Sequence, residues 1–119
     1  MCTIQLALSD ADKAAVLSRM LSRSTEIPVL CVETPDFATA CVVVMDTQRF
    51  EREPLAAVHA DRVVLITRND EVRLRAAWDA GVQTVLSDQD PLNTVVLAVL
   101  STCLRAGTVK HIPEGMRLM

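Results

Sequence analysis

Apolar residues along this chain are gathered in short, nearly continuous runs, and five of these runs predict β-strands. Unbroken runs of β-branched and aliphatic residues are typical of parallel strands whose two faces are both covered by helices. The predicted strands span residues 4–8, 28–33, 41–45, 62–67 and 84–87. A parallel sheet buried on both faces is therefore the expected centre of the fold.

Helical patterns occupy most of the segments between these strands, over residues 11–23, 53–59, 70–80 and 91–106. Ser9 is the predicted N-cap of the first helix, and Asp90 that of the last. Gly81 and Gly107 are the predicted ends of the third and fourth helices. The alternation of strands and helices predicts an α/β doubly wound, flavodoxin-like fold, with five parallel strands in the order 2-1-3-4-5.

The connection between the second and third predicted strands is unusually short. Only residues 34–40 join them, and a chain of this length reaches at most about 23–25 Å. In the order 2-1-3-4-5 the connection crosses the first strand, which takes about 22 Å. We therefore expect a nearly extended link with one turn at most, so that the second helix of the fold is lost or reduced. The alternative is a rearranged sheet edge.

Composition narrows the class of protein further. The chain has 119 residues, of which 50% are hydrophobic and 3% aromatic, so we expect one domain with an aliphatic core. A net charge of -3 gives no basic surface for nucleic acid, so that DNA would be contacted only through a domain absent from this chain. No run is long enough to span a bilayer, and the first residues lack the basic start of a secretion signal. We expect no membrane partner and a cytoplasmic location.

The order of elements and several segments resemble the receiver domain of two-component response regulators. These segments are VVVMD at the third strand, VVLIT at the fourth, AAWDAGVQTVL after it, and the amphipathic last helix. The resemblance implies a non-enzymatic, receiver-like signalling domain over residues 1–107. The tail 108–119 resembles the start of the linker in regulators that carry a LuxR-type helix-turn-helix.

Receivers accept a phosphoryl group on an aspartate at the end of strand three, and two acids after strand one hold Mg²⁺ beside it. The resemblance places Asp46 at this phosphoacceptor position and Thr67 at the hydroxyl that ends strand four. The acidic pair is replaced by Leu and Ser, with Asp10 one place later, and Asp88 stands where receivers have a lysine. A carboxylate attacks a phosphoryl anion only when cations neutralise the charge. The chain therefore resembles an atypical, degenerate receiver, and Asp46 is a structural cap, a phosphoacceptor or a ligand contact.

Doubly wound sheets bind ligands in a crevice at the carboxyl ends of their strands. Three acids in this crevice would favour a cationic ligand, a divalent ion or an internal arginine, and Arg68 lies within reach of Asp46. Asp10 and Asp46 are weak candidates for Mg²⁺, and no other cofactor or metal is expected. The predicted lining is Ser9, Asp10, Asp46, Thr47, Thr67, Arg68 and Asp88.

The last helix carries the strongest signal for a partner. Residues 95–100 are apolar around the whole helix, so that one face packs on the sheet and another is left exposed. We expect a homodimer with Val96, Leu100 and Cys103 as the outward set, and with the helix over 11–23 beside it. The alternative is that the tail 108–119 covers this face. The four cysteines contain no C-x-x-C pair, and we expect small buried hydrophobes in a reducing compartment.

Three functions are compatible with these patterns. The first is a pseudo-receiver that controls dimerisation of a transcriptional regulator without conventional phosphorylation. The second is a small-molecule or ion sensor that uses the crevice, and the third is a Mg²⁺-dependent Asp phosphoacceptor. Asp88 and the broken acidic pair favour the first function. An adaptor that docks on another protein also remains open.

Overall fold

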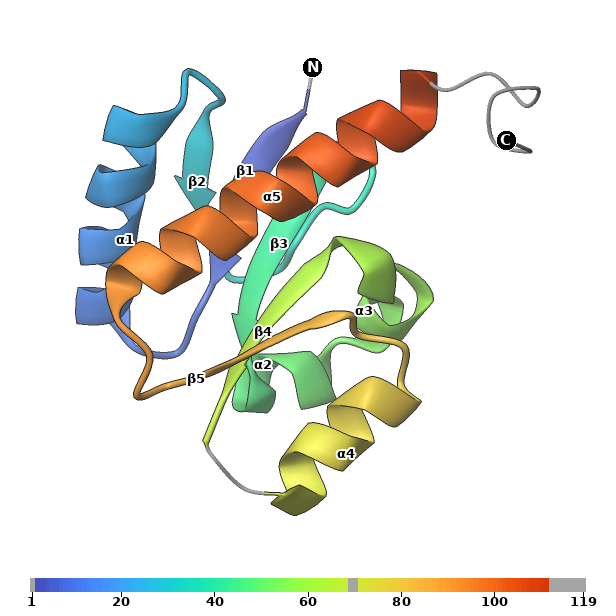
Figure 1. The fold of residues 1–119 in the computed structure, drawn as a ribbon. Coiled ribbons are helices and arrows are strands. Elements are labelled where there is room, and N and C mark those ends of the chain that lie inside the picture. Colours follow the sequence, from blue (N-terminus) through green and yellow to red (C-terminus); the bar gives the residue numbers. More distant parts are fainter. Residues whose placement is uncertain (1, 69–70, 112–119) are drawn as a thin grey trace.

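Within residues 2–68 and 71–111, which the computed structural model describes, five parallel strands form one sheet in the order β2-β1-β3-β4-β5 (Figure 1). The central strand β3 is buried from Ala40 to Met45, since helices cover both faces of the sheet. The doubly wound, flavodoxin-like sheet and its strand order are thus confirmed. The strands are β1 (Thr3–Ala7), β2 (Val29–Cys31), β3 (Ala40–Asp46), β4 (Val63–Thr67) and β5 (Thr84–Ser87).

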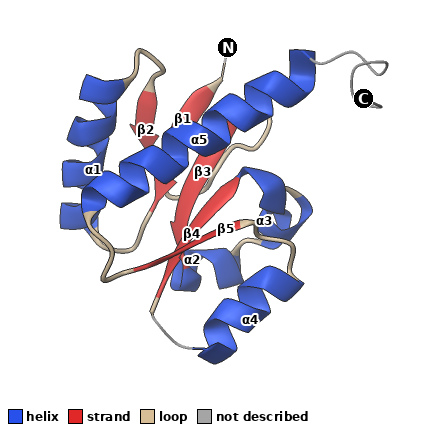
Figure 2. Ribbon diagram, in the orientation of Figure 1, coloured by secondary structure: helices blue, strands red, loops and turns tan. Residues whose placement is uncertain are grey.

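Helices follow every strand except β2 (Figure 2). Among the described residues, no helix is long and apolar enough to cross a membrane. The helices are α1 (Ala11–Ser24), α2 (Thr47–Arg52), α3 (Pro54–Val58), a 3₁₀ turn η1 (Ala60–Arg62), α4 (Glu71–Asp79) and α5 (Leu92–His111).

Aliphatic side chains pack in two layers, one on each face of the sheet. Successive side chains of β3 point to opposite faces, as in any strand. Val42 and Val44 pack with the buried side of α1 and α5, whereas Val43 and Met45 pack with α3, η1 and α4. The unbroken apolar run of β3 is therefore explained by two separate cores that share one strand.

The connection from β2 to β3 contains no helix, as its length predicted. Its one turn is closed by the carbonyl of Asp36, which accepts from the N–H of Thr39 at 3.2 Å and of Ala40 at 3.0 Å. The buried side chain of Gln5 on β1 holds this turn from below. Its Oε1 accepts from the Asp36 N–H at 2.8 Å, and its Nε2 donates to Thr39 Oγ1 at 3.2 Å. The crossover is therefore fixed by hydrogen bonds to one polar side chain within the sheet.

Helix ends agree only in part with the sequence predictions. Gly81, at φ 94°, ends α4 as expected, and the N–H of Val82 reaches back to the carbonyl of Ala77 at 3.1 Å in a Schellman motif. The predicted end at Gly107 is wrong, because α5 continues to His111. A glycine costs a helix only about 1 kcal/mol, and the preceding turns of α5 are held by packing on the sheet.

Two predicted caps are also wrong. Asp10, and not Ser9, caps α1: its Oδ1 accepts from the N–H of Asp12 at 3.0 Å and of Lys13 at 3.1 Å. α5 begins at Leu92, and the carboxylate of Asp90 instead accepts from the N–H of Ser87 at 2.9 Å. In both cases the carboxylate bonds the nearest free N–H groups of the turn in which it lies.

Candidate functional site

A hollow of about 650 Å³ lies at the carboxyl ends of β1, β3 and β4. It brings together all seven residues that the sequence predicted for the crevice: Ser9, Asp10, Asp46, Thr47, Thr67, Arg68 and Asp88. The helices that follow the strands add further polar residues that motif positions did not indicate, namely Lys13, Gln48, Glu51 and Arg73. These four were missed because the family pattern marks strand ends, whereas they lie on the helices beyond them.

Asp46 ends β3 and is the N-cap of α2, a helix that the sequence did not predict. Its Oδ1 accepts from the N–H of Arg49 at 2.9 Å, in the first turn of that helix. Its other oxygen, Oδ2, accepts from the N–H of Ser9 at 2.7 Å, and the Ser9 hydroxyl lies 3.3 Å from Oδ1. The carboxylate thus ties the loop after β1 to the start of α2, which is the capping role left open by the sequence.

The carboxylate of Asp10 is also held by hydrogen bonds to the backbone. One of its carboxylate oxygens accepts two backbone N–H groups at the start of α1, where a negative charge is also favoured by the helix dipole. Mg²⁺ takes about six oxygen ligands in a near-octahedral shell. Both weak candidates for that ion, Asp10 and Asp46, therefore already serve as acceptors for backbone N–H groups.

Thr67 ends β4 with a buried hydroxyl. This hydroxyl accepts a hydrogen bond from the Thr47 hydroxyl at 2.7 Å, so that β4 is linked to the first residue of α2. The Thr67 carbonyl accepts from the N–H of Asp88 at 2.9 Å, which positions the loop after β5 next to the crevice. The side chain of Asp88 is exposed there.

The charges around the hollow are more balanced than the sequence predicted. Among the described lining residues, Glu51 joins the three expected acids, and Lys13 and Arg73 join Arg68. Arg73 Nη1 lies 4.0 Å from Glu51 Oε1. The predicted pair between Arg68 and Asp46, both described, does not form in this structure. The crevice therefore presents four carboxylates beside three cations, whereas the predicted lining had three acids and Arg68 alone as a cation.

The predicted outward face of α5 is wrong. Val96 and Cys103 are only 7% and 8% exposed and pack in the core beneath the helix, and Leu100 is half-buried against the same core. Among the residues of α5 whose burial is described, which end at residue 105, the exposed large apolar side chains are Leu97 and Leu104, at 68% and 71%. Because the buried stripe of α5 is wide, an apolar pattern around the helix does not indicate which residues point outward.

No model of a known protein family matches this chain, and no curated protein matches it. Solved structures do match it. One is the signal receiver domain of a protein named as a Luxo repressor, from Vibrio parahaemolyticus, with a TM-score of 0.65 and 15% sequence identity. The match covers 92% of this chain and 96% of that chain. At this identity the likeness shows the fold alone: the chain has the flavodoxin-like fold of a signal receiver domain.

Proposed function

We propose that this chain is a pseudo-receiver, a non-catalytic signalling domain that controls the dimerisation of a transcriptional regulator without conventional phosphorylation. The receiver fold supports a signalling domain. The observation that carries the finer proposal is the composition of the crevice, where Asp46 is present but a carboxylate, Asp88, follows β5 in place of the lysine of receivers.

The reason is electrostatic. A phosphoryl donor brings further negative charge to Asp46, and transfer requires cations close to the phosphoryl oxygens. Asp88 adds a negative charge on the side where receivers place a positive one. The carboxylate of Asp46 is also occupied, since both of its oxygens accept hydrogen bonds that hold Ser9 and Arg49. Phosphorylation would disturb these bonds and gain little stabilisation.

The dimerisation part of the proposal is supported by the exposed face of α5. Leu97 and Leu104 are seven residues apart, so they lie on one side of the helix two turns from each other. Burial of a leucine side chain contributes about 1.5–3 kcal/mol. In a dimer with a two-fold axis, both leucines would be buried in each of the two subunits. The neighbouring helix α1 adds Val16, which is also exposed.

Phosphotransfer is tested by incubating the reduced chain with acetyl phosphate and Mg²⁺ and measuring its intact mass. We expect no stoichiometric phosphoryl adduct, with Asp46→Asn as the matched control for background labelling. The double variant Ser9→Asp and Asp88→Lys restores two missing charges, and we expect it to raise the labelled fraction. A full adduct on the wild-type chain that Asp46→Asn abolishes would favour the Mg²⁺-dependent phosphoacceptor instead.

A second candidate function, a small-molecule sensor, is favoured by the mixed charge of the hollow. Carboxylates such as Asp10 and Glu51 line it together with Lys13 and Arg68, and this arrangement suits a ligand that carries both signs of charge. Amide NMR shifts during titration with small zwitterions test this function. Shifts confined to the crevice residues would support it, and shifts scattered elsewhere would count against it.

A further inference from the structure

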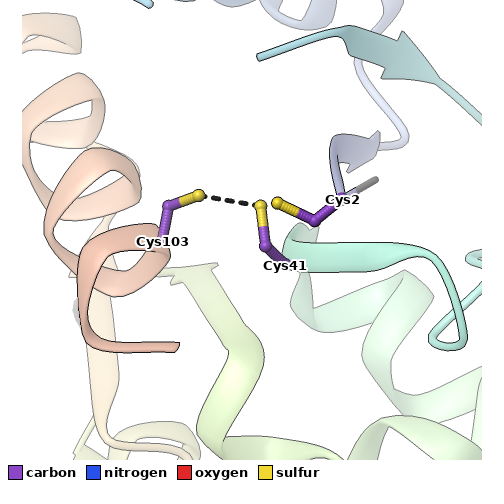
Figure 3. Close-up of side chains that lie close together, drawn as sticks. All are labelled: Cys2, Cys41 and Cys103. Atoms are coloured by element: carbon purple, nitrogen blue, oxygen red, sulfur yellow. Dashed lines mark hydrogen bonds between the residues drawn. The ribbon is translucent and has the colours of Figure 1, made fainter. Parts of the chain in front are cut away.

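Three cysteines converge at the end of the sheet opposite to the crevice. Cys2 lies directly before β1, Cys41 is the second residue of β3, and Cys103 lies on α5. Their Sγ atoms all lie within 4.8 Å of one another, and the Sγ atoms of Cys41 and Cys103 are 2.7 Å apart. Figure 3 shows the three sulfur atoms turned toward one another from these separate elements. This cluster was not predicted from the sequence, since the three residues are brought together only by the fold.

The surroundings of the cluster are apolar. Cys41 and Cys103 are buried in the core and Cys2 is half-buried beside them. Burial raises the pKa of the Cys41 thiol well above its usual value, and the hydrogen bond that this thiol makes to Cys103 raises it further. Burial also raises the pKa of the Cys103 thiol. The thiols therefore keep their protons unless a positive ion arrives to replace them.

We propose that Cys2, Cys41 and Cys103 form a binding site for one soft, thiophilic metal or metalloid ion in three-coordinate sulfur ligation. Thiolate ligands select soft ions, whereas Mg²⁺ and Ca²⁺ prefer oxygen. A structural Zn²⁺ site takes four protein ligands, and in the described part of the chain no fourth ligand joins the three sulfurs.

The geometry fits such an ion. A metal–sulfur bond of about 2.3 Å places the sulfurs of a three-coordinate complex about 3.5–4 Å apart. This spacing is longer than the 2.7 Å between the Sγ atoms of Cys41 and Cys103 and lies within the limit of 4.8 Å for the whole group. The Sγ atoms of Cys41 and Cys103 would therefore move apart when the ion binds.

The net charge of the complex determines which ions the site should prefer. A complex of three thiolates has a net charge of −2 with a monovalent ion and of −1 with a divalent ion. With a trivalent ion the complex is neutral. A net charge in an apolar interior is costly, so a trivalent ion such as As(III) ranks first. With arsenous acid, three As–O bonds break and three As–S bonds form. The three thiol protons leave with the three hydroxides as water, and no electrons are transferred.

A bound ion would join the starts of β1 and β3 to α5. It would hold the buried face of α5 against the sheet, whereas Leu97 and Leu104 are exposed. This consequence for dimerisation rests on the proposed function, whereas the ion site does not. Titration with arsenite measures ion binding alone. A chain that binds no ion would therefore leave the proposed function untouched.

The test is native mass spectrometry of the full, reduced chain titrated with arsenite. We expect one arsenic per chain, with the mass of three hydrogens lost. Cys2→Ser is the decisive variant, because this residue precedes β1 and is only half-buried at the edge of the core, and it should weaken binding at least tenfold. Cys103→Ser should do the same, with circular dichroism to verify folding. Cys31→Ser, which removes an exposed thiol outside the cluster, is the matched control and should bind as the wild type does.

Several outcomes would overturn the proposal. They are no arsenic uptake by the reduced chain, unchanged affinity in Cys2→Ser, or a loss of binding in Cys31→Ser equal to that in Cys2→Ser. A disulfide between Cys41 and Cys103 that forms in air, with no uptake of arsenite after reduction, would identify a redox pair and not an ion site. A parallel titration with Cu(I) tests the ranking by charge, which is contradicted if Cu(I) displaces arsenite.

Discussion

Replacing Asp46 by alanine should destabilise the fold, because the carboxylate is a structural link between two elements. Asp46→Ala removes the N-cap of α2, and loss of a cap costs about 1 kcal/mol. It also removes the acceptor of the Ser9 N–H, which lies 2.7 Å from Oδ2. A hydrogen bond to a charged group contributes about 1.5–3 kcal/mol, and we take the lower end because the carboxylate is half-exposed. The expected loss of unfolding free energy is therefore about 2–3 kcal/mol.

Asp46→Asn separates the two contributions. In the wild type the N–H groups of Arg49 and Ser9 bond different oxygens of Asp46. In the asparagine one of these two oxygens is replaced by an NH₂ group, which cannot accept a hydrogen bond. We expect this variant to lose about 1–2 kcal/mol, between the wild type and Asp46→Ala. The assay is urea unfolding followed by circular dichroism, with Asp88→Ala as a control that removes an exposed carboxylate from the same crevice.

The control should change the unfolding free energy by less than about 0.5 kcal/mol. An Asp46→Ala variant as stable as the wild type would refute this reasoning. It would show that repulsion between Asp46 and the acids Asp10, Glu51 and Asp88 offsets its hydrogen bonds. The crevice would then be a destabilised site, as expected of a functional phosphoacceptor.

Three further changes test other parts of the structure. Gln5→Leu should lower the unfolding free energy by about 2–4 kcal/mol in urea titrations, because it leaves polar groups of the β2–β3 connection unpaired; an unchanged value would mean that water replaces the side chain. Leu97→Glu should give a folded monomer by light scattering, whereas Leu100→Glu should mainly destabilise the fold, and the reverse result would contradict the assigned face. Because the pKa values of Cys41 and Cys103 are raised on folding, the unfolded chain loses thiol protons that the folded chain retains. Stability should therefore be full below about pH 9 and fall at higher pH by up to about 1.4 kcal/mol per pH unit for each thiol. A flat profile of unfolding free energy up to pH 10 would contradict this.

The sheet could be predicted from sequence because its evidence is local. Unbroken β-branched runs indicate buried parallel strands, and the shortness of the segment between the second and third strands leaves no room for a helix. The crevice residues followed from the same logic, since parallel strands bring their carboxyl ends to one edge. Asp46, Thr67 and Asp88 therefore lie together without any contact being known in advance.

The features that were not predicted depend on tertiary context. The prediction of the outward face of α5 was wrong because residues 95–100 are apolar on all sides of the helix. Only packing on the sheet determines which of them are exposed. The helix α2 was missed because it depends on the cap by Asp46. In the sequence, Gln5 is a single polar residue within a predicted strand. Its hydrogen bonds to the β2–β3 connection can be recognised only in the folded structure. The cysteine cluster joins residues up to 101 positions apart in sequence.

The proposed function requires that this chain dimerises without phosphorylation. Light scattering of the wild-type chain, with and without acetyl phosphate and Mg²⁺, tests it most directly, with Asp46→Asn measured in parallel. We expect the mass of a dimer in all samples, unchanged by the phosphoryl donor. A wild-type monomer that becomes a dimer only with acetyl phosphate and Mg²⁺, and not in Asp46→Asn, would contradict it.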